Sequence, residues 1–205
     1  MAARAQSARP DIGERRLYLI TDARSGLAAL LERAIAGGAD VVQIREKTLP
    51  DGLLLGRLEE AREVTRRHDV PLVVNDRPDL AALVDADYVH VGQDDLPVPR
   101  ARQLLDRVGQ STHTRRQIET SSADYIGVGP IYATPTKEGR APVGLSLVAD
   151  AVEVARRPWF AIGGIGLDTI DDVVGAGATR IAVVRAVADA ADPEAAARAL
   201  RKRLG

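Results

Sequence analysis

The stretch LYLITDARSGLAALLERAIAGGADVVQI, residues 17–44, decides the fold, because it contains one complete structural repeat. Two short apolar runs, 17–21 and 41–44, have the length and composition of buried strands. Between them, residues 25–38 carry apolar side chains at helical spacing and end in a glycine pair, which is typical of a helix C-terminus. The segment therefore predicts a strand–helix–strand unit of the kind that builds parallel sheets.

The same pattern continues to the end of the chain. Further apolar runs occur at 71–74, 88–91, 108–111, 125–129, 159–164 and 180–184, and a segment with helical spacing follows each run. Eight such units most simply close into a (β/α)8 TIM barrel, although 205 residues is near the lower limit for that fold. A doubly wound open sheet is the alternative. We assign residues 17–205 to a single barrel domain and residues 1–16 to a flexible N-terminal lead-in.

The composition argues against several classes of protein. Lys and Arg number 28 against 29 Asp and Glu, and this balance disfavours a general binder of nucleic acid or of membrane surfaces. The chain has no cysteine, which excludes disulfides and thiolate metal sites. No apolar run reaches the roughly 20 residues that span a bilayer, and the first residues lack the apolar centre of a signal peptide. We expect a cytoplasmic protein that acts on small molecules, and a homodimer is compatible with the sequence.

Polar side chains gather just after the apolar runs, where barrels of this type place their sites. They are Asp22, Gln43, Arg45, Lys47, Asn75, Asp76, His90, Asp95, Ser111, His113, Thr134, Thr136, Lys137 and Arg185, and glycines such as Gly164 lie in the same turns. The opposite ends of the strands offer only small residues, prolines and ordinary surface charges. The pattern therefore predicts one polar site at the C-terminal end of the barrel.

Three of these residues alternate at the end of the second apolar run. Gln43, Arg45 and Lys47 share one face of an extended strand, and such a face should be apolar unless it meets a ligand. The alternative is that Arg45 and Lys47 pair with Glu46 or with surface acids. The shared face favours an anionic ligand.

Two carboxylates follow neighbouring strands. Asp76 and Asp95 could share Mg²⁺, which favours one or two protein carboxylates completed by water and phosphate oxygens. The alternative is helix N-capping, because each residue precedes a segment with helical spacing. Their place beside Arg45 and Lys47 favours the metal.

The segment AIGGIG, residues 161–166, resembles a phosphate cradle, because glycine lets the backbone approach an anion and a helix follows. Arg185 directly after the last strand strengthens this interpretation, since a guanidinium suits phosphate geometry. Among the histidines, His90 lies within an apolar run and is interpreted as a satisfied core residue. His113 follows Ser111 and is a candidate site residue.

The motifs LYLITD, QIREK, VVNDRPDLA, HVGQDDLP, STHT, VGPIYATPTKEGRAPVGL and AIGGI occur in this order. Together they resemble the thiamine phosphate synthase family over residues 17–200, and QIREK, HVGQDD and TPTK are the most specific. The resemblance implies a transferase of thiamine biosynthesis, which joins a pyrimidine diphosphate to a thiazole phosphate. Thiamine monophosphate and pyrophosphate would be formed through a dissociative, Mg²⁺-assisted reaction.

The resemblance also implies roles for the matching residues. The expected contacts of the diphosphate are Arg45, Lys47, Asn75 and Lys137. Asp76 and Asp95 would hold Mg²⁺ on it, Gln43 would help to hold the pyrimidine, and Ser111 would lie close to it. The expected contacts of the thiazole phosphate are Thr134 and Thr136, with backbone N–H groups of Gly164, Val184 and Arg185. The residues expected to be catalytic are Lys137, Arg45, Lys47 and Ser111.

The loop at 132–145 would then be a lid that excludes water from the reacting cation. Two departures from the family pattern stand out: the connection before Ser111 is short, and Arg185 replaces a serine. Three rivals remain at this point. They are a thiazole tautomerase that uses His113 for proton transfer, a non-catalytic binding barrel, and a sugar-phosphate isomerase.

Overall fold

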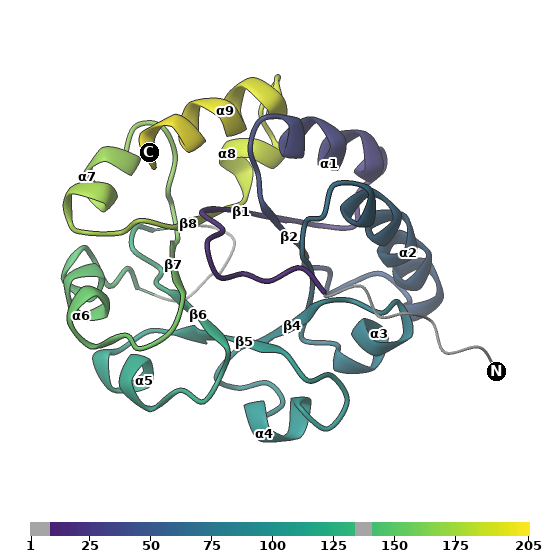
Figure 1. Ribbon diagram of the computed structural model, residues 1–205, viewed down its shortest axis with the longest axis horizontal. Helices are drawn as coiled ribbons and strands as arrows, with labels where there is room; N and C mark the ends of the chain where they lie inside the picture. The colour runs from purple at the N-terminus through teal and green to yellow at the C-terminus, as the bar shows by residue number, and fades with distance from the viewer. Residues whose placement is uncertain (1–8, 134–140) are drawn as a thin grey trace.

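The computed structural model describes residues 9–133 and 141–205, in which eight parallel strands form a closed barrel (Figure 1). The strands are β1 (Leu17–Thr21), β2 (Val41–Ile44), β3 (Leu72–Asn75), β4 (Tyr88–Val91), β5 (Val108–Thr112), β6 (Tyr125–Val128), β7 (Trp159–Ile162) and β8 (Ile181–Val183). Neighbours pair in chain order, and β8 pairs in parallel with β1, which closes the ring. The predicted (β/α)8 barrel is confirmed, and the open sheet is excluded.

Helices surround the barrel as an outer ring (Figure 1). They are α1 (Leu27–Ala36), α2 (Asp51–Arg67), α3 (Pro78–Leu83), α4 (Val98–Ala101), α5 (Arg115–Thr120), α6 (Ser146–Val154), α7 (Ile170–Gly175), α8 (Arg185–Ala188) and α9 (Pro193–Arg203). The helix α8 follows β8 directly and was not expected from the sequence. The short connection before Ser111 is accommodated by the brevity of α4, so β5 keeps five residues. Among the described residues, no helix is long and apolar enough to cross a membrane.

The barrel interior is filled mainly by aromatic rings. Tyr18, Tyr125 and Phe160 are fully or almost fully buried, and their rings meet edge to face with centroids 5.2 to 6.0 Å apart. Tyr88 packs on Tyr125 in the same way at 5.6 Å. Gly109 makes room for this cluster, because a Cβ there would lie 2.2 Å from the Tyr125 ring. Large rings can fill so small a barrel, but their hydroxyl groups then need partners inside it.

Residues 9–16 pack against the N-terminal end of the barrel. Ile12 is buried against the aromatic cluster, and its amide donates to Tyr88 Oη at 3.3 Å. Arg180 donates to the carbonyl oxygens of Gly13 and Arg15, at 2.6 and 3.0 Å. The part of the predicted lead-in that the structure describes therefore closes this end, and the C-terminal end is left for ligands.

Candidate active site

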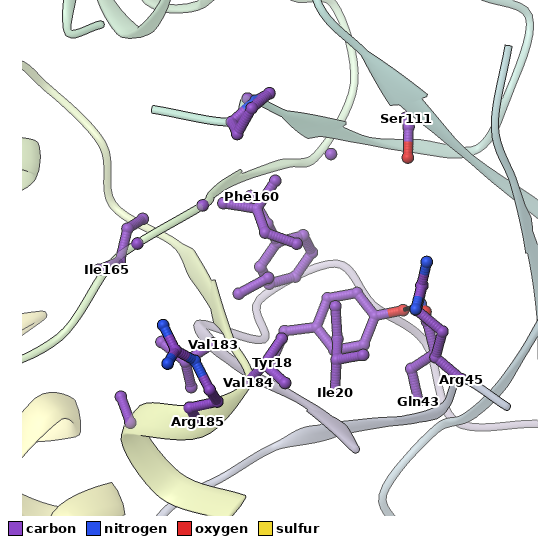
Figure 2. A pocket seen from close by; sticks show the side chains of 18 of the residues that line it. Tyr18, Ile20, Gln43, Arg45, Ser111, Phe160, Ile165, Val183, Val184 and Arg185 are labelled. Atoms are coloured by element: carbon purple, nitrogen blue, oxygen red, sulfur yellow. Dashed lines mark hydrogen bonds between the residues drawn. The ribbon is translucent and has the colours of Figure 1, made fainter. Parts of the chain in front are cut away.

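A cavity of about 260 Å³ opens at the C-terminal end of the strands (Figure 2). Eight predicted site residues line it, and they are Gln43, Arg45, Asn75, Ser111, His113, Gly164, Val184 and Arg185. Its walls also include apolar side chains, chiefly Ile20, Phe160 and Ile162. A chamber with apolar walls and a few polar groups is typical of a small-molecule site.

Arg45 and Arg185 lie on different sides of this cavity (Figure 2). Within the described part of the chain, neither guanidinium forms an ion pair, whereas Arg77 pairs with Asp51 at 2.6 Å. An unpaired guanidinium that faces a cavity is suited to an anionic ligand, because it can donate two parallel hydrogen bonds. The cavity therefore presents two separate positive groups to its contents.

The loop after β2 is organised by Glu46. Its carboxylate accepts hydrogen bonds from the amides of Lys47, Thr48 and Leu49, at 2.9, 2.7 and 3.2 Å, and from the Thr48 hydroxyl. Burial raises the pKa of Glu46, but the Thr48 and backbone hydrogen bonds outweigh it and lower that pKa to about 2. Glu46 therefore holds the backbone of the loop, and among the described residues it forms no ion pair with Arg45 or Lys47, although Lys47 does pair with another acid, Asp76.

Asp76 and Asp95 are not among the residues that line the cavity, but their carboxyl groups lie within hydrogen-bonding reach of each other. Lys47 Nζ lies 3.1 Å from Asp76 Oδ2, and the Asp76 amide donates to the His90 carbonyl at 2.8 Å. Burial raises the pKa of Asp76, and the neighbouring Asp95 carboxyl raises it further. Neither residue caps a helix, because α3 and α4 start after Arg77 and Pro97 without a side-chain cap.

The acidic pair fits a magnesium ion. The Asp95 carboxyl raises the pKa of Asp76, and a cation bound between the two carboxylates would relieve this repulsion. Among the described residues, no group of three or more His, Cys, Asp or Glu side chains could hold a metal. A pair of hard oxygen donors without further protein ligands suits Mg²⁺, which completes its shell with water and phosphate oxygens.

The turn after β7 is shaped by glycine. Gly164 has a φ of 63°, and a Cβ there would lie 2.7 Å from the Tyr132 Cβ. The Tyr132 amide donates to the Gly163 carbonyl at 3.0 Å, so the start of the loop after β6 is anchored on this turn. Three predicted residues of that loop, Thr134, Thr136 and Lys137, lie outside the described residues.

A family model described as thiamine monophosphate synthase matches residues 17–187. The chain belongs to this family. It is 47% identical to the thiamine-phosphate synthase of Saccharopolyspora erythraea, with 96% of each chain covered. It is 50% identical to that of Thermus thermophilus, with 92% of this chain and 97% of the relative covered. The thiamine phosphate pyrophosphorylase structure from Pyrococcus furiosus superposes with a TM-score of 0.85 at 33% identity, covering 93% and 95% of the two chains. The resemblance inferred from the motifs is confirmed.

In this member of the thiamine monophosphate synthase family, His90 is both a core residue and part of the cavity wall. It is 8% exposed, and its two ring nitrogens lie 3.0 Å from Tyr125 Oη and 3.0 Å from Ser111 Oγ. The sequence predicted His90 as a satisfied core residue but did not predict that it lines the cavity. A tyrosine inside a small barrel was the available signal, because its hydroxyl must find a buried partner.

His113 also lines the cavity of this family member. Its Nδ1 contacts the Gly129 carbonyl oxygen, and its amide donates to Gln117 Oε1 at 2.7 Å. Since a carbonyl oxygen only accepts, Nδ1 carries the proton of that contact. The backbone of the β6 end thus fixes the ring of His113.

Proposed function

We propose that this chain acts as a thiamine-phosphate synthase through a dissociative, Mg²⁺-assisted reaction within the cavity of Figure 2. It joins a pyrimidine diphosphate to a thiazole phosphate and releases pyrophosphate. The observation that carries the proposal is the presence of two guanidiniums, Arg45 and Arg185, on different sides of one chamber with apolar walls, neither of which forms an ion pair with another described residue. Two anionic substrates can then lie with their phosphates apart and their rings together.

The diphosphate binds on the side formed by β2, β3 and β4. Arg45, Lys47 and Asn75 hold its oxygens, and Lys137, which follows β6 in the sequence, is proposed as a further donor to it. When the carbon–oxygen bond breaks, its electron pair goes to the pyrophosphate, so these donors stabilise a growing negative charge. The methylene cation that remains on the pyrimidine is attacked by the thiazole nitrogen. The protein therefore needs no nucleophile of its own.

Asp76 and Asp95 hold the magnesium ion, which neutralises charge on the diphosphate when it is bound. The Lys47 ammonium, now 3.1 Å from Asp76, is close enough to turn toward the same diphosphate. A lysine suits this place because its compact charge sits on a flexible stem.

The two rings lie between the apolar walls. Gln43 and Ser111 hold the pyrimidine, while Ile20, Phe160 and Ile162 exclude water that could capture the cation. The thiazole phosphate binds at the turn after β7, where Gly164, Val184 and Arg185 line the cavity. Thr134 and Thr136 are proposed to complete that phosphate site.

The test is pyrophosphate release by the purified protein with both substrates, with and without Mg²⁺. The proposal expects release that needs the thiazole phosphate, the pyrimidine diphosphate and the metal together. Omission of each component in turn is the control. Conversion of a thiazole phosphate tautomer without pyrophosphate release, independent of Mg²⁺, would contradict the proposal and support the tautomerase. The expected homodimer and cytoplasmic location stay predictions, and sedimentation velocity tests the first.

A further inference from the structure

A row of hydrogen-bonded polar groups crosses the barrel interior and ends at the cavity. Gln43 Nε2 contacts Tyr18 Oη, and Tyr18 Oη lies 2.9 Å from Tyr125 Oη. Tyr125 Oη is 3.0 Å from His90 Nδ1, and His90 Nε2 is 3.0 Å from Ser111 Oγ. The side chains come from five strands, so closure of the barrel is required to assemble the row. Figure 2 shows Tyr18, Gln43 and Ser111 around the cavity.

The chemistry of the groups gives this row a direction. An amide nitrogen only donates, so Gln43 gives a hydrogen bond to Tyr18. The geometry of the Tyr18–Tyr125 contact allows either phenol to donate, but within the described residues Tyr125 is the acceptor left for the Tyr18 proton, and a buried hydroxyl proton without an acceptor is costly. Within the described residues, the Tyr125 hydroxyl has only Tyr18 and His90 as partners. Its single proton therefore points at His90 Nδ1. That leaves the His90 proton on Nε2, where it is donated to Ser111.

We propose that this row fixes His90 as the Nε2–H tautomer and orients Ser111 as a hydrogen-bond donor toward the cavity. The inference rests on the proposed function, because the acceptor is then a ring nitrogen of the pyrimidine substrate. His90 is a positioning residue, which acts through Ser111. A ring that offers an acceptor atom is bound, and a ring that offers a donor there is rejected.

Two features support a fixed direction. Tyr18 and Tyr125 are fully buried, and burial raises the pKa of both phenols, so both keep their protons at neutral pH. Edge-to-face packing against Phe160 also restricts both rings. The two phenols in the middle of the row are therefore un-ionised at neutral pH and restricted in rotation.

The first test reads the tautomers directly. In the ligand-free protein labelled with ¹⁵N-histidine, His90 should show a protonated Nε2 and an unprotonated Nδ1. His113, whose Nδ1 faces the Gly129 carbonyl, should show the opposite pattern. The chain has three histidines, and the variants His68→Gln and His113→Gln, each lacking one set of signals, assign the signals of His90 independently of its tautomer. A His90 that carries its proton on Nδ1, or on both nitrogens, would overturn the proposal.

The second test breaks the row at a hydroxyl. Tyr125→Phe removes the donor to His90 but keeps the ring, so the His90 signals should shift to a mixture of tautomers. The KM for the pyrimidine diphosphate should rise about fivefold, as for the loss of one hydrogen bond. Tyr18→Phe, one step further along, should change both readouts in the same direction.

Tyr88→Phe is the matched control. The Tyr88 ring packs on Tyr125 at 5.6 Å, but its hydroxyl contacts Asp11 and the Ile12 amide at the closed end. This variant should leave the His90 tautomer and the KM within about twofold of the parent. Equal effects from all three variants, or none from Tyr125→Phe, would mean that the row has only a structural role. The tautomer readout stands apart from catalysis, so a wild-type protein without pyrophosphate release would defeat the proposed function alone.

Discussion

The two sides of the cavity present different kinds of chemical group. The β2–β4 side, which we define as Arg45 in the cavity wall together with Lys47, Asp76 and Asp95 outside it, uses charged side chains that follow the ends of strands. The β7–β8 side, defined as Gly164, Val184 and Arg185, combines a glycine turn, backbone groups and one guanidinium. The first side gathers four charged side chains, whereas the second has a single charged side chain among backbone groups.

This difference matches the two phosphorylated substrates. The diphosphate gains negative charge as its bond to the pyrimidine breaks, so donors there contribute more to the transition state than to the ground state. The thiazole phosphate keeps its charge throughout, so its donors contribute to binding alone. Changes on the β2–β4 side should therefore lower kcat, and changes on the β7–β8 side should raise a KM.

The largest effect is expected from the acidic pair. Asp95→Asn removes one charge but keeps an oxygen for the Gly92 amide, which now donates to Asp95 Oδ2 at 2.8 Å. We expect kcat to fall by about 10²- to 10³-fold because the metal is held less firmly, measured in a Mg²⁺ titration. Asp94→Asn, at the exposed neighbouring residue, is the control. A kcat of Asp95→Asn near the parent value at low Mg²⁺ would remove Asp95 from the metal site.

Lys137→Ala tests the contribution of the loop after β6 to the β2–β4 side. Loss of a donor to the leaving pyrophosphate should reduce turnover by about 10²-fold, measured by rapid-quench pyrophosphate release. Lys202→Ala, on the exposed face of α9, should have no effect. Near-normal turnover in Lys137→Ala would exclude Lys137 from the mechanism.

A smaller effect is expected from Glu46, whose carboxylate holds the backbone of the loop that carries Arg45 and Lys47. Its folded pKa of about 2 lies below the ordinary 4.5, so the folded state binds fewer protons than the unfolded state. Its contribution to stability is therefore full above pH 4.5 and is lost as the pH falls from about 4.5 to about 2.

Glu46→Gln should lower the free energy of unfolding at pH 7 by about 1 kcal/mol, since the loop is partly solvated. The difference from the parent should shrink toward pH 2, as measured by urea unfolding at several pH values. Glu59→Gln, at an exposed residue of α2, is the control. A pH-independent difference would show that the charge of Glu46 does not support the loop.

Much of the difference between the two sides of the cavity could be predicted from the sequence. Arg45, Asp76 and Arg185 follow buried apolar runs, and strand ends converge in any closed parallel barrel. The sequence of apolar runs and the polar residues that follow them was therefore enough to predict the barrel and these residues of the site. The side chain of Glu46 was the exception, because four hydrogen bonds to its own loop compete with its neighbours Arg45 and Lys47.

Contacts across the barrel could not be predicted in this way. Tyr18, Tyr125 and His90 belong to β1, β6 and β4, and their meeting depends on how far each ring reaches into the interior. The packing of residues 9–16 could not be predicted from local sequence patterns either, because Ile12 packs against Tyr88, which lies 76 residues away in the chain. Apolar periodicity places residues on a strand face but does not choose their partners.

The most direct measurement of the division between the two sides compares Arg45→Met with Arg185→Met. Both changes keep an unbranched stem and remove the guanidinium. With saturating substrates, Arg45→Met should lower kcat by about 10²-fold. Arg185→Met should instead raise the KM for the thiazole phosphate about tenfold and leave kcat within about threefold. If Arg185→Met lowered kcat as much as Arg45→Met while its thiazole phosphate KM stayed at the parent value, the division of roles would be contradicted.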